Sequence, residues 1–88
     1  MNQSILFPDI QTWNEELNAV TFPAQQAGAL VECVASVSYL TQLSGQTING
    51  TQQALEVFDQ NRFEIEEQAE QLIEDEEYNA QGMIELIG

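Results

Sequence analysis

The chain has 88 residues, of which 15 are acidic, one is basic and none is histidine, so its formal net charge is −14. A surface with this charge repels the phosphates of nucleic acids and the anionic face of a membrane, which excludes direct binding to either. Hydrophobic residues make up 43% of the chain, enough for a folded core, and the length predicts one domain, residues 1–88.

The sequence also predicts a cytoplasmic protein. No apolar run approaches the ~18 residues of a membrane-spanning helix. Residues 1–9 carry no basic segment ahead of their short apolar patch, so a secretory signal is not expected. The single cysteine, Cys33, cannot form an internal disulfide, which fits a reducing compartment.

In chain order, the first predicted element is a short helix. Asp9 follows Pro8 and is a candidate cap, and Ile10, Trp13 and Leu17 recur at helical spacing.

A β-hairpin is predicted next, from Asn18 to Ala35. Its two segments, AVTFPAQQ and ALVECVA, alternate in polarity, and Ala27 and Gly28 between them suit a tight turn. Pro23 cannot donate a backbone hydrogen bond, so its strand should lie at an edge or turn that nitrogen outward. Ser36 or Ser38 should then cap a short helix that Gly45 ends.

One long helix is predicted from Gln52 to Glu77, with Thr51 as its cap. Its apolar positions recur every three or four residues: Leu55, Phe58, Ile65, Ala69, Leu72 and Ile73. Asn79 and Gly82 should end it, and GMIELIG should form a last strand. The predicted fold class is α+β, with a small antiparallel sheet of hairpin plus C-terminal strand, packed against helices that include one long acidic C-terminal helix.

Several segments resemble a small bacterial family known as domain-of-unknown-function family 1488: LFPD, VTFPA, Trp13, Gly28, Cys33 and FDQNRFEIEEQAEQLIE. The resemblance covers nearly the whole chain and implies an α+β order of helix, two strands, two helices and a strand. It implies no activity. The family often has histidine before the arginine, where this chain has Asn61, so a role for that imidazole could not operate here.

No catalytic constellation is expected, and no cofactor. Cys33 has no imidazole to activate its thiol and lies on the alternating face of a strand, where core packing explains it better than nucleophilic chemistry. Glu32 and Glu85 interrupt apolar strands, and outward-facing strand positions explain both more simply than acid–base catalysis.

A cation site is the alternative chemistry. Glu66, Glu70 and Glu74 are spaced to lie on one helix face with Glu67 beside them, and carboxylates bind hard divalent cations. A solvated helix face is the simpler interpretation, so no dedicated metal site is predicted.

Arg62 falls inside the apolar stripe of the predicted helix. A base placed there should be paired, and Asp59 and Glu66 are within reach. We expect a structural ion pair; the alternative is an anion-recognition point.

The acidic residues concentrate in the second half of the chain, including the helix end that would favour cations. Each acid in the last turn of a helix costs about 0.3–1 kcal/mol at low salt. We therefore expect these side chains to serve solubility or a basic protein partner: Glu67, Glu70, Glu74, Asp75, Glu76 and Glu77. The sequence favours a non-enzymatic protein-binding module, monomeric or weakly dimeric; the alternative is a module for a small ligand or divalent cation.

Overall fold

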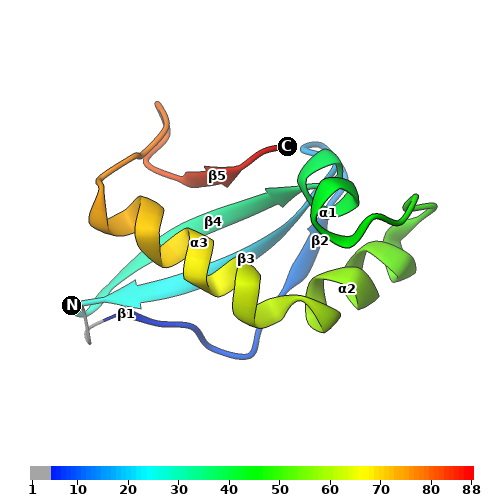
Figure 1. The fold of residues 1–88 in the computed structure, drawn as a ribbon. Helices are drawn as coiled ribbons and strands as arrows, with labels where there is room; N and C mark the ends of the chain where they lie inside the picture. The colour runs from blue at the N-terminus through cyan, green and yellow to red at the C-terminus, as the bar shows by residue number, and fades with distance from the viewer. Residues whose placement is uncertain (1–4) are drawn as a thin grey trace.

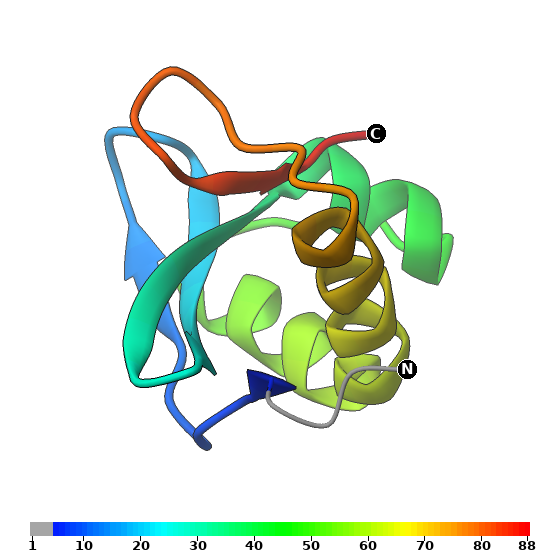
Figure 2. The same cartoon turned by 90° about the vertical axis from the view of Figure 1, so that its left-hand side faces the viewer.

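A five-stranded sheet with helices packed on one of its faces makes up the fold (Figures 1 and 2). The structure is a computed structural model that describes residues 5–88. Residues 1–4, the start of the segment assessed for a secretory signal, lie outside the described residues. The elements in chain order are β1 (Ile5–Leu6), β2 (Thr12–Asn14), β3 (Ala19–Gln26), β4 (Ala29–Ser36), α1 (Val37–Ser44), α2 (Thr51–Gln60), α3 (Arg62–Glu74) and β5 (Ile84–Leu86).

The predicted hairpin is confirmed as β3 and β4, which pair antiparallel from Ala19↔Ser36 to Gln26↔Ala29. Ala27 and Gly28 join them with φ values of 51° and 86°, the two positive values that a type I′ turn requires. This turn matches the twist of the strands and fixes their register.

Pro23 lies inside β3, opposite Glu32. The bond from Val37 N–H to the Asn18 carbonyl, 3.1 Å, marks a hydrogen-bonded pair, and such pairs alternate along an antiparallel ladder. The Pro23 nitrogen therefore faces away from β4. On that side, β2 pairs with residues 19–21 of β3 and β1 with residues 25–26, so Pro23 faces the gap between them.

The prediction of a short helix after Asp9 is wrong, because that segment forms β2. Trp13 pairs with Val20 on the helix-covered side of the sheet, whereas Ile10 and Leu17 are exposed. The helical spacing of these three residues therefore marked no apolar face. The order of elements implied by the family resemblance is wrong in two places: two strands replace the first helix, and three helices rather than two lie between the hairpin and the last strand.

The sheet is mixed rather than antiparallel, which corrects a second expectation. β5 pairs with β4 in parallel, with Cys33 opposite Ile84 and Ala35 opposite Leu86. Parallel strands need a crossover connection, and the three helices between β4 and β5 supply it.

The short helix α1 follows its prediction. The Ser36 hydroxyl accepts a hydrogen bond from Tyr39 N–H at 3.0 Å, and Gly45 ends the helix with φ 71°. Thr51, by contrast, is the first residue of α2 rather than its cap, and Gly50 occupies the cap position.

The prediction of a single long helix from Gln52 to Glu77 is wrong. The chain forms two helices, α2 and α3, separated at Asn61, which has φ −115° and ψ 23°. The Asn61 side-chain amide donates to the Val57 carbonyl at 2.8 Å and holds the end of α2. A straight helix of that length would extend about 39 Å, beyond the longest dimension of the molecule, 36 Å. The bend lets both helices pack on the same sheet.

The core lies between the helices and one face of the sheet. The rings of Phe22 in β3 and Phe58 in α2 meet there, with centroids 5.0 Å apart. Most other side chains of the core are aliphatic and come from both layers: Val20, Ala24, Cys33, Ala35, Ile84 and Leu86 from the sheet, and Leu40, Ala54, Val57, Ile65, Ala69 and Ile73 from the helices.

Candidate interaction surface

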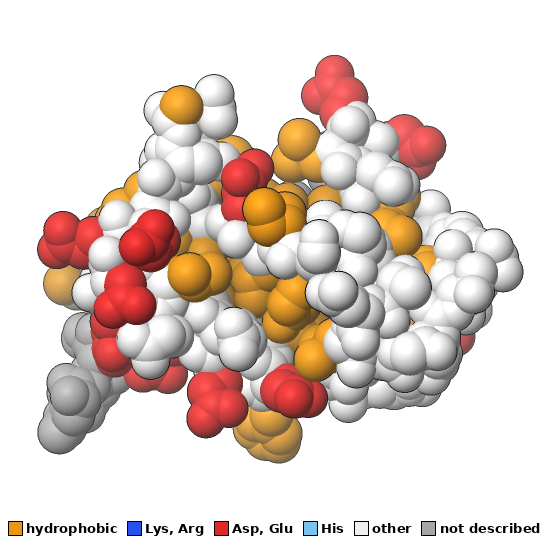
Figure 3. Space-filling view, turned by 45° about the horizontal axis from the view of Figure 1, so that its top comes forward, with side chains coloured by type: hydrophobic (Ala, Val, Ile, Leu, Met, Phe, Trp, Pro, Cys, Tyr) orange, Lys and Arg blue, Asp and Glu red, His pale blue; other side chains and the backbone are white. Residues whose placement is uncertain are grey.

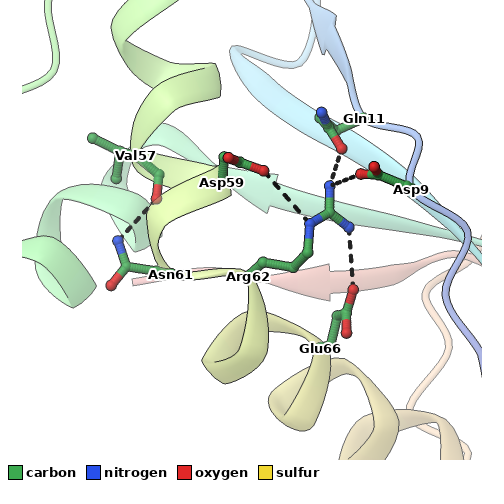
Figure 4. Close-up of polar contacts among 7 residues, drawn as sticks. All are labelled: Asp9, Gln11, Val57, Asp59, Asn61, Arg62 and Glu66. Atoms are coloured by element: carbon green, nitrogen blue, oxygen red, sulfur yellow. Dashed lines mark hydrogen bonds and ion pairs between the residues drawn. The ribbon is translucent and has the colours of Figure 1, made fainter.

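Arg62 is the first residue of α3, and carboxylates from three parts of the chain surround its guanidinium (Figure 4). Nη1 lies 3.1 Å from Glu66 Oε2, Nη2 lies 3.2 Å from Asp9 Oδ1, and Nε lies 3.7 Å from Asp59 Oδ1. Nη2 also donates to Gln11 Oε1. The Arg62 side chain is 19% exposed, so its charge is largely removed from water and compensated within the fold.

The expected contacts of Arg62 with Asp59 and Glu66 are confirmed. The contacts with Asp9 and Gln11 were not predicted, because those residues lie about fifty positions earlier and no local pattern indicates the approach. With three carboxylates beside it, the guanidinium has little remaining attraction for an anion. The geometry favours the structural role.

Six carboxylates, here called the α3 acidic surface, were predicted to bind a partner. Glu67, Glu70 and Glu74 lie on α3 at spacings of three and four, so they share one side of the helix. The other three follow in the turn after it: Asp75, Glu76 and Glu77. All six are exposed except Glu70, which is half-buried, and none forms an ion pair within residues 5–88.

Figure 3 shows acidic side chains along the side of the molecule that carries α3, and no Lys or Arg side chain on the face it draws. Arg62 is the only basic residue of the sequence, and its guanidinium is already paired. The α3 acidic surface is therefore unneutralised by other side chains of the described chain.

The end of α3 explains how so many acids are tolerated there. Glu76 N–H donates to the Ile73 carbonyl and Glu77 N–H to the Leu72 carbonyl, both at 3.0 Å, which is the Schellman pattern. Glu76 adopts φ 56°, a left-handed conformation that glycine usually fills. Backbone capping and the burial of Ile73 hold this end despite the unfavourable charge.

Phe63 is the residue of this region that sequence reasoning missed. It is the second residue of α3 and is 90% exposed. It lines a cleft of about 510 Å³ with Asp59, Glu64 and Glu67. The available signal was its place off the apolar stripe, between Arg62 and Glu64, where a large apolar side chain has no core to enter.

The candidate catalytic residues are not brought together. Cys33 is fully buried, and burial, followed by the charge of Glu32, raises the pKa of its thiol from 9.0 to about 12. A protonated, inaccessible thiol is a poor nucleophile. Glu32 and Glu85 are exposed strand residues, as expected.

Within residues 5–88, no group of three or more His, Cys, Asp or Glu side chains is arranged to hold a metal ion. Of the proposed cation ligands Glu66, Glu70 and Glu74, the first is bound to Arg62. No helix in the described part of the chain has the length and apolar character needed to cross a membrane.

Comparison with known proteins places this fold among uncharacterised relatives. The chain is 38% identical to "Uncharacterized protein YrdB" of Escherichia coli K12 and 37% identical to the protein of that name in Shigella flexneri, each over 98% of this chain and 99% of the relative. A crystal structure of a DUF1488-family protein of unknown function from Shewanella loihica PV-4 matches with a TM-score of 0.91 and 47% identity, over 97% of this chain and 93% of that one.

The α+β architecture described above is thus shared with a solved relative. The family model described as "Protein of unknown function (DUF1488)" matches residues 5–86, which is nearly the entire chain, including the hairpin, Arg62 and α3. The protein therefore belongs to the DUF1488 family.

Proposed function

We propose that this protein is a non-enzymatic cytoplasmic binding module that docks a basic protein partner through the α3 acidic surface. One observation carries the proposal: six carboxylates are concentrated on α3 and the turn after it, and none has a cationic partner within residues 5–88. Charge complementarity of this kind favours rapid association that weakens as salt increases.

The contrast with Arg62 supports a role beyond charge compensation in the fold. Asp9, Asp59 and Glu66 converge on the one base of the chain and stabilise the packing of α3. The carboxylates of the α3 acidic surface compensate no such base, and the four at its end, from Glu74 to Glu77, oppose the dipole of the helix end. Their placement costs stability, which a function on the surface would explain.

The surroundings of the candidate catalytic groups in residues 5–88 support the non-enzymatic assignment. Cys33 is buried, the sequence contains no histidine, and the acids beside the clefts are in contact with water. A carboxylate needs a water-poor site to act as an acid or base near neutral pH.

The test is affinity capture from native lysate at low and at high salt, followed by calorimetry with the purified captured protein. The test variant neutralises the end of the surface: Glu74→Gln, Asp75→Asn, Glu76→Gln and Glu77→Gln. The matched control removes the same charge elsewhere: Glu15→Gln, Glu16→Gln, Glu32→Gln and Glu85→Gln. All eight positions are exposed, so both variants should fold.

We expect the partner to be basic, to dissociate at high salt, and to bind the test variant at least tenfold more weakly than the control. Equal loss of affinity in both variants would assign binding to net charge rather than to this surface. A partner that binds the test variant as tightly as the native protein would overturn the proposal.

A further inference from the structure

Phe63 stands between two clefts that are both lined by carboxylates. The first, about 510 Å³, includes Glu64 and Glu67, together with Arg62 and the Asp59 that pairs with it. The second, about 280 Å³, includes Phe7, Glu66, Glu67 and Glu70. Glu66 is paired with Arg62, so the carboxylates of these clefts without a cationic partner within residues 5–88 are Glu64, Glu67 and Glu70. Phe63 and Glu67 line both clefts, so the phenyl ring forms a ridge with unpaired carboxylates on either side.

A single exposed apolar side chain is ordinary on a protein surface. The surroundings distinguish Phe63, because a bare phenyl ring beside carboxylates is the arrangement that receives a cation: the ring face attracts it, and the carboxylates pair with it. Glu67 lies one helical turn after Phe63, so its carboxylate is on the same side of α3 as the ring. Glu64 lines the first cleft together with them.

The same protein contains an occupied version of this arrangement. The Arg62 guanidinium carbon lies 5.1 Å from the centroid of the Phe58 ring, and Asp59 and Glu66 pair with its nitrogens. At Phe63 the ring is present beside the unpaired carboxylates of Glu64, Glu67 and Glu70, but the chain has no second basic side chain to fill the position.

We propose that Phe63 and Glu67 form the centre of a docking site for a partner segment that carries two arginine or lysine side chains. One basic side chain enters each cleft, and a guanidinium lies against the Phe63 ring as Arg62 lies against Phe58. The inference rests on the proposed function and adds to it the anchoring residue and the chemistry of the bound segment.

A second copy of this chain does not fit the site. Each copy has a formal net charge of −14 and one basic residue, which is already paired. Bringing this surface against its own copy would place carboxylates beside carboxylates without compensation. The complementary occupant is a basic segment of another protein.

The test uses a hexa-arginine peptide as the probe, with calorimetry for affinity and amide NMR shifts for location. Phe63→Ala removes the ring, and Leu30→Ala is the matched control, because Leu30 is a 71% exposed apolar residue of β4. Glu67→Gln is compared with Glu16→Gln, which removes the same charge at a distance. Phe63→Trp enlarges the ring that receives the cation.

We expect shifts centred on residues 59–70, and affinity about 3- to 10-fold weaker for Phe63→Ala than for Leu30→Ala. Glu67→Gln should weaken binding more than Glu16→Gln, and Phe63→Trp should bind at least as tightly as the native protein.

Two results would overturn the inference. One is unchanged affinity in Phe63→Ala; if the neutralised α3 acidic surface still loses its partner, the proposed function stands without this anchor. The other is an NMR titration in which the amide signals of residues 59–70 do not shift, whether or not the peptide binds elsewhere. In that case the capture experiment decides separately whether the acidic surface docks a protein at all.

Discussion

The guanidinium of Arg62 lies over the ring of Phe58, with its charged carbon 5.1 Å from the ring centroid. Phe58 is fully buried against Phe22 of the sheet, so the one base of the chain rests on the aromatic centre of the core. Its carboxylate partners come from the segment before β2, from α2 and from α3. Arg62 thus joins three separate segments at the helix break.

Replacing Arg62 with methionine should therefore lower the free energy of unfolding by about 1–3 kcal/mol. Methionine keeps most of the apolar stem but leaves three carboxylates close together without a cation. The measurement is urea unfolding followed by circular dichroism. Adding Glu66→Gln to this variant should restore part of the loss, because it removes one of the repelling charges. Native-like stability in Arg62→Met would contradict the structural role.

Glu76 should be a site of stored strain. Its φ of 56° is unfavourable for a residue with a Cβ, and its charge opposes the dipole of α3. Glu76→Gly should raise the free energy of unfolding by about 1 kcal/mol. Glu76→Gln keeps the Cβ and removes only the charge, so it should give a smaller gain. Glycine that stabilises no more than glutamine would place the strain elsewhere.

Added sodium chloride should raise the melting temperature of this protein. The unpaired carboxylates repel one another, and salt weakens that repulsion, with a screening length of about 10 Å at 0.1 M. The variant with Glu74→Gln, Asp75→Asn, Glu76→Gln and Glu77→Gln should show a weaker dependence. A melting temperature that falls between low and moderate salt would be incompatible with this account.

Cys33 should react with a thiol reagent such as dithionitrobenzoate only when the protein unfolds, because its side chain has no access to solvent. The reaction rate at pH 8 should follow the fraction unfolded as urea is added. A fast reaction of the folded protein, at a rate independent of urea, would contradict the burial of the thiol.

The pKa of Cys33 also gives a direction for stability against pH. Burial raises the pKa to about 12 in the folded protein, whereas the exposed thiol ionises near 9.0. Above pH 9 the unfolded chain binds fewer protons than the folded protein. The contribution of this thiol to the free energy of unfolding, fully present below pH 9, is therefore lost as pH rises toward 12. Tyr39, whose pKa is raised by burial and by Glu64, acts in the same sense. Cys33→Ala should therefore lose less stability between pH 8 and 10 than the native protein.

The features that sequence predicted correctly are those governed by neighbours in the chain. The β3–β4 hairpin follows from alternation and from the two residues that can adopt positive φ in its turn. The limits of α1 follow from the Ser36 hydroxyl and the left-handed Gly45. The Arg62 contacts with Asp59 and Glu66 follow from helical proximity.

The features that sequence missed depend on distant parts of the chain. β2 forms because β3 offers its free edge to a three-residue segment, and the spacing of Trp13 contains no information about that edge. The break at Asn61 lets α2 and α3 pack on the same sheet, and the apolar stripe, which continues across it, contains no sign of it. Phe63 lies off the apolar stripe, which was the one signal in the sequence that its ring is exposed, but the clefts beside it are known only from the folded chain.

Pro23 has a consequence for how this protein behaves at high concentration. Within residues 5–88, residues 22–24 of β3 have no strand partner between the pairings of β1 and β2. Unpaired backbone groups at a sheet edge are points at which another chain can pair. A residue with an N–H at that point would offer a donor to the incoming strand. Proline offers no N–H, so a strand from another molecule would find no donor at this position. Pro23 therefore protects this part of the β3 edge against intermolecular pairing and aggregation.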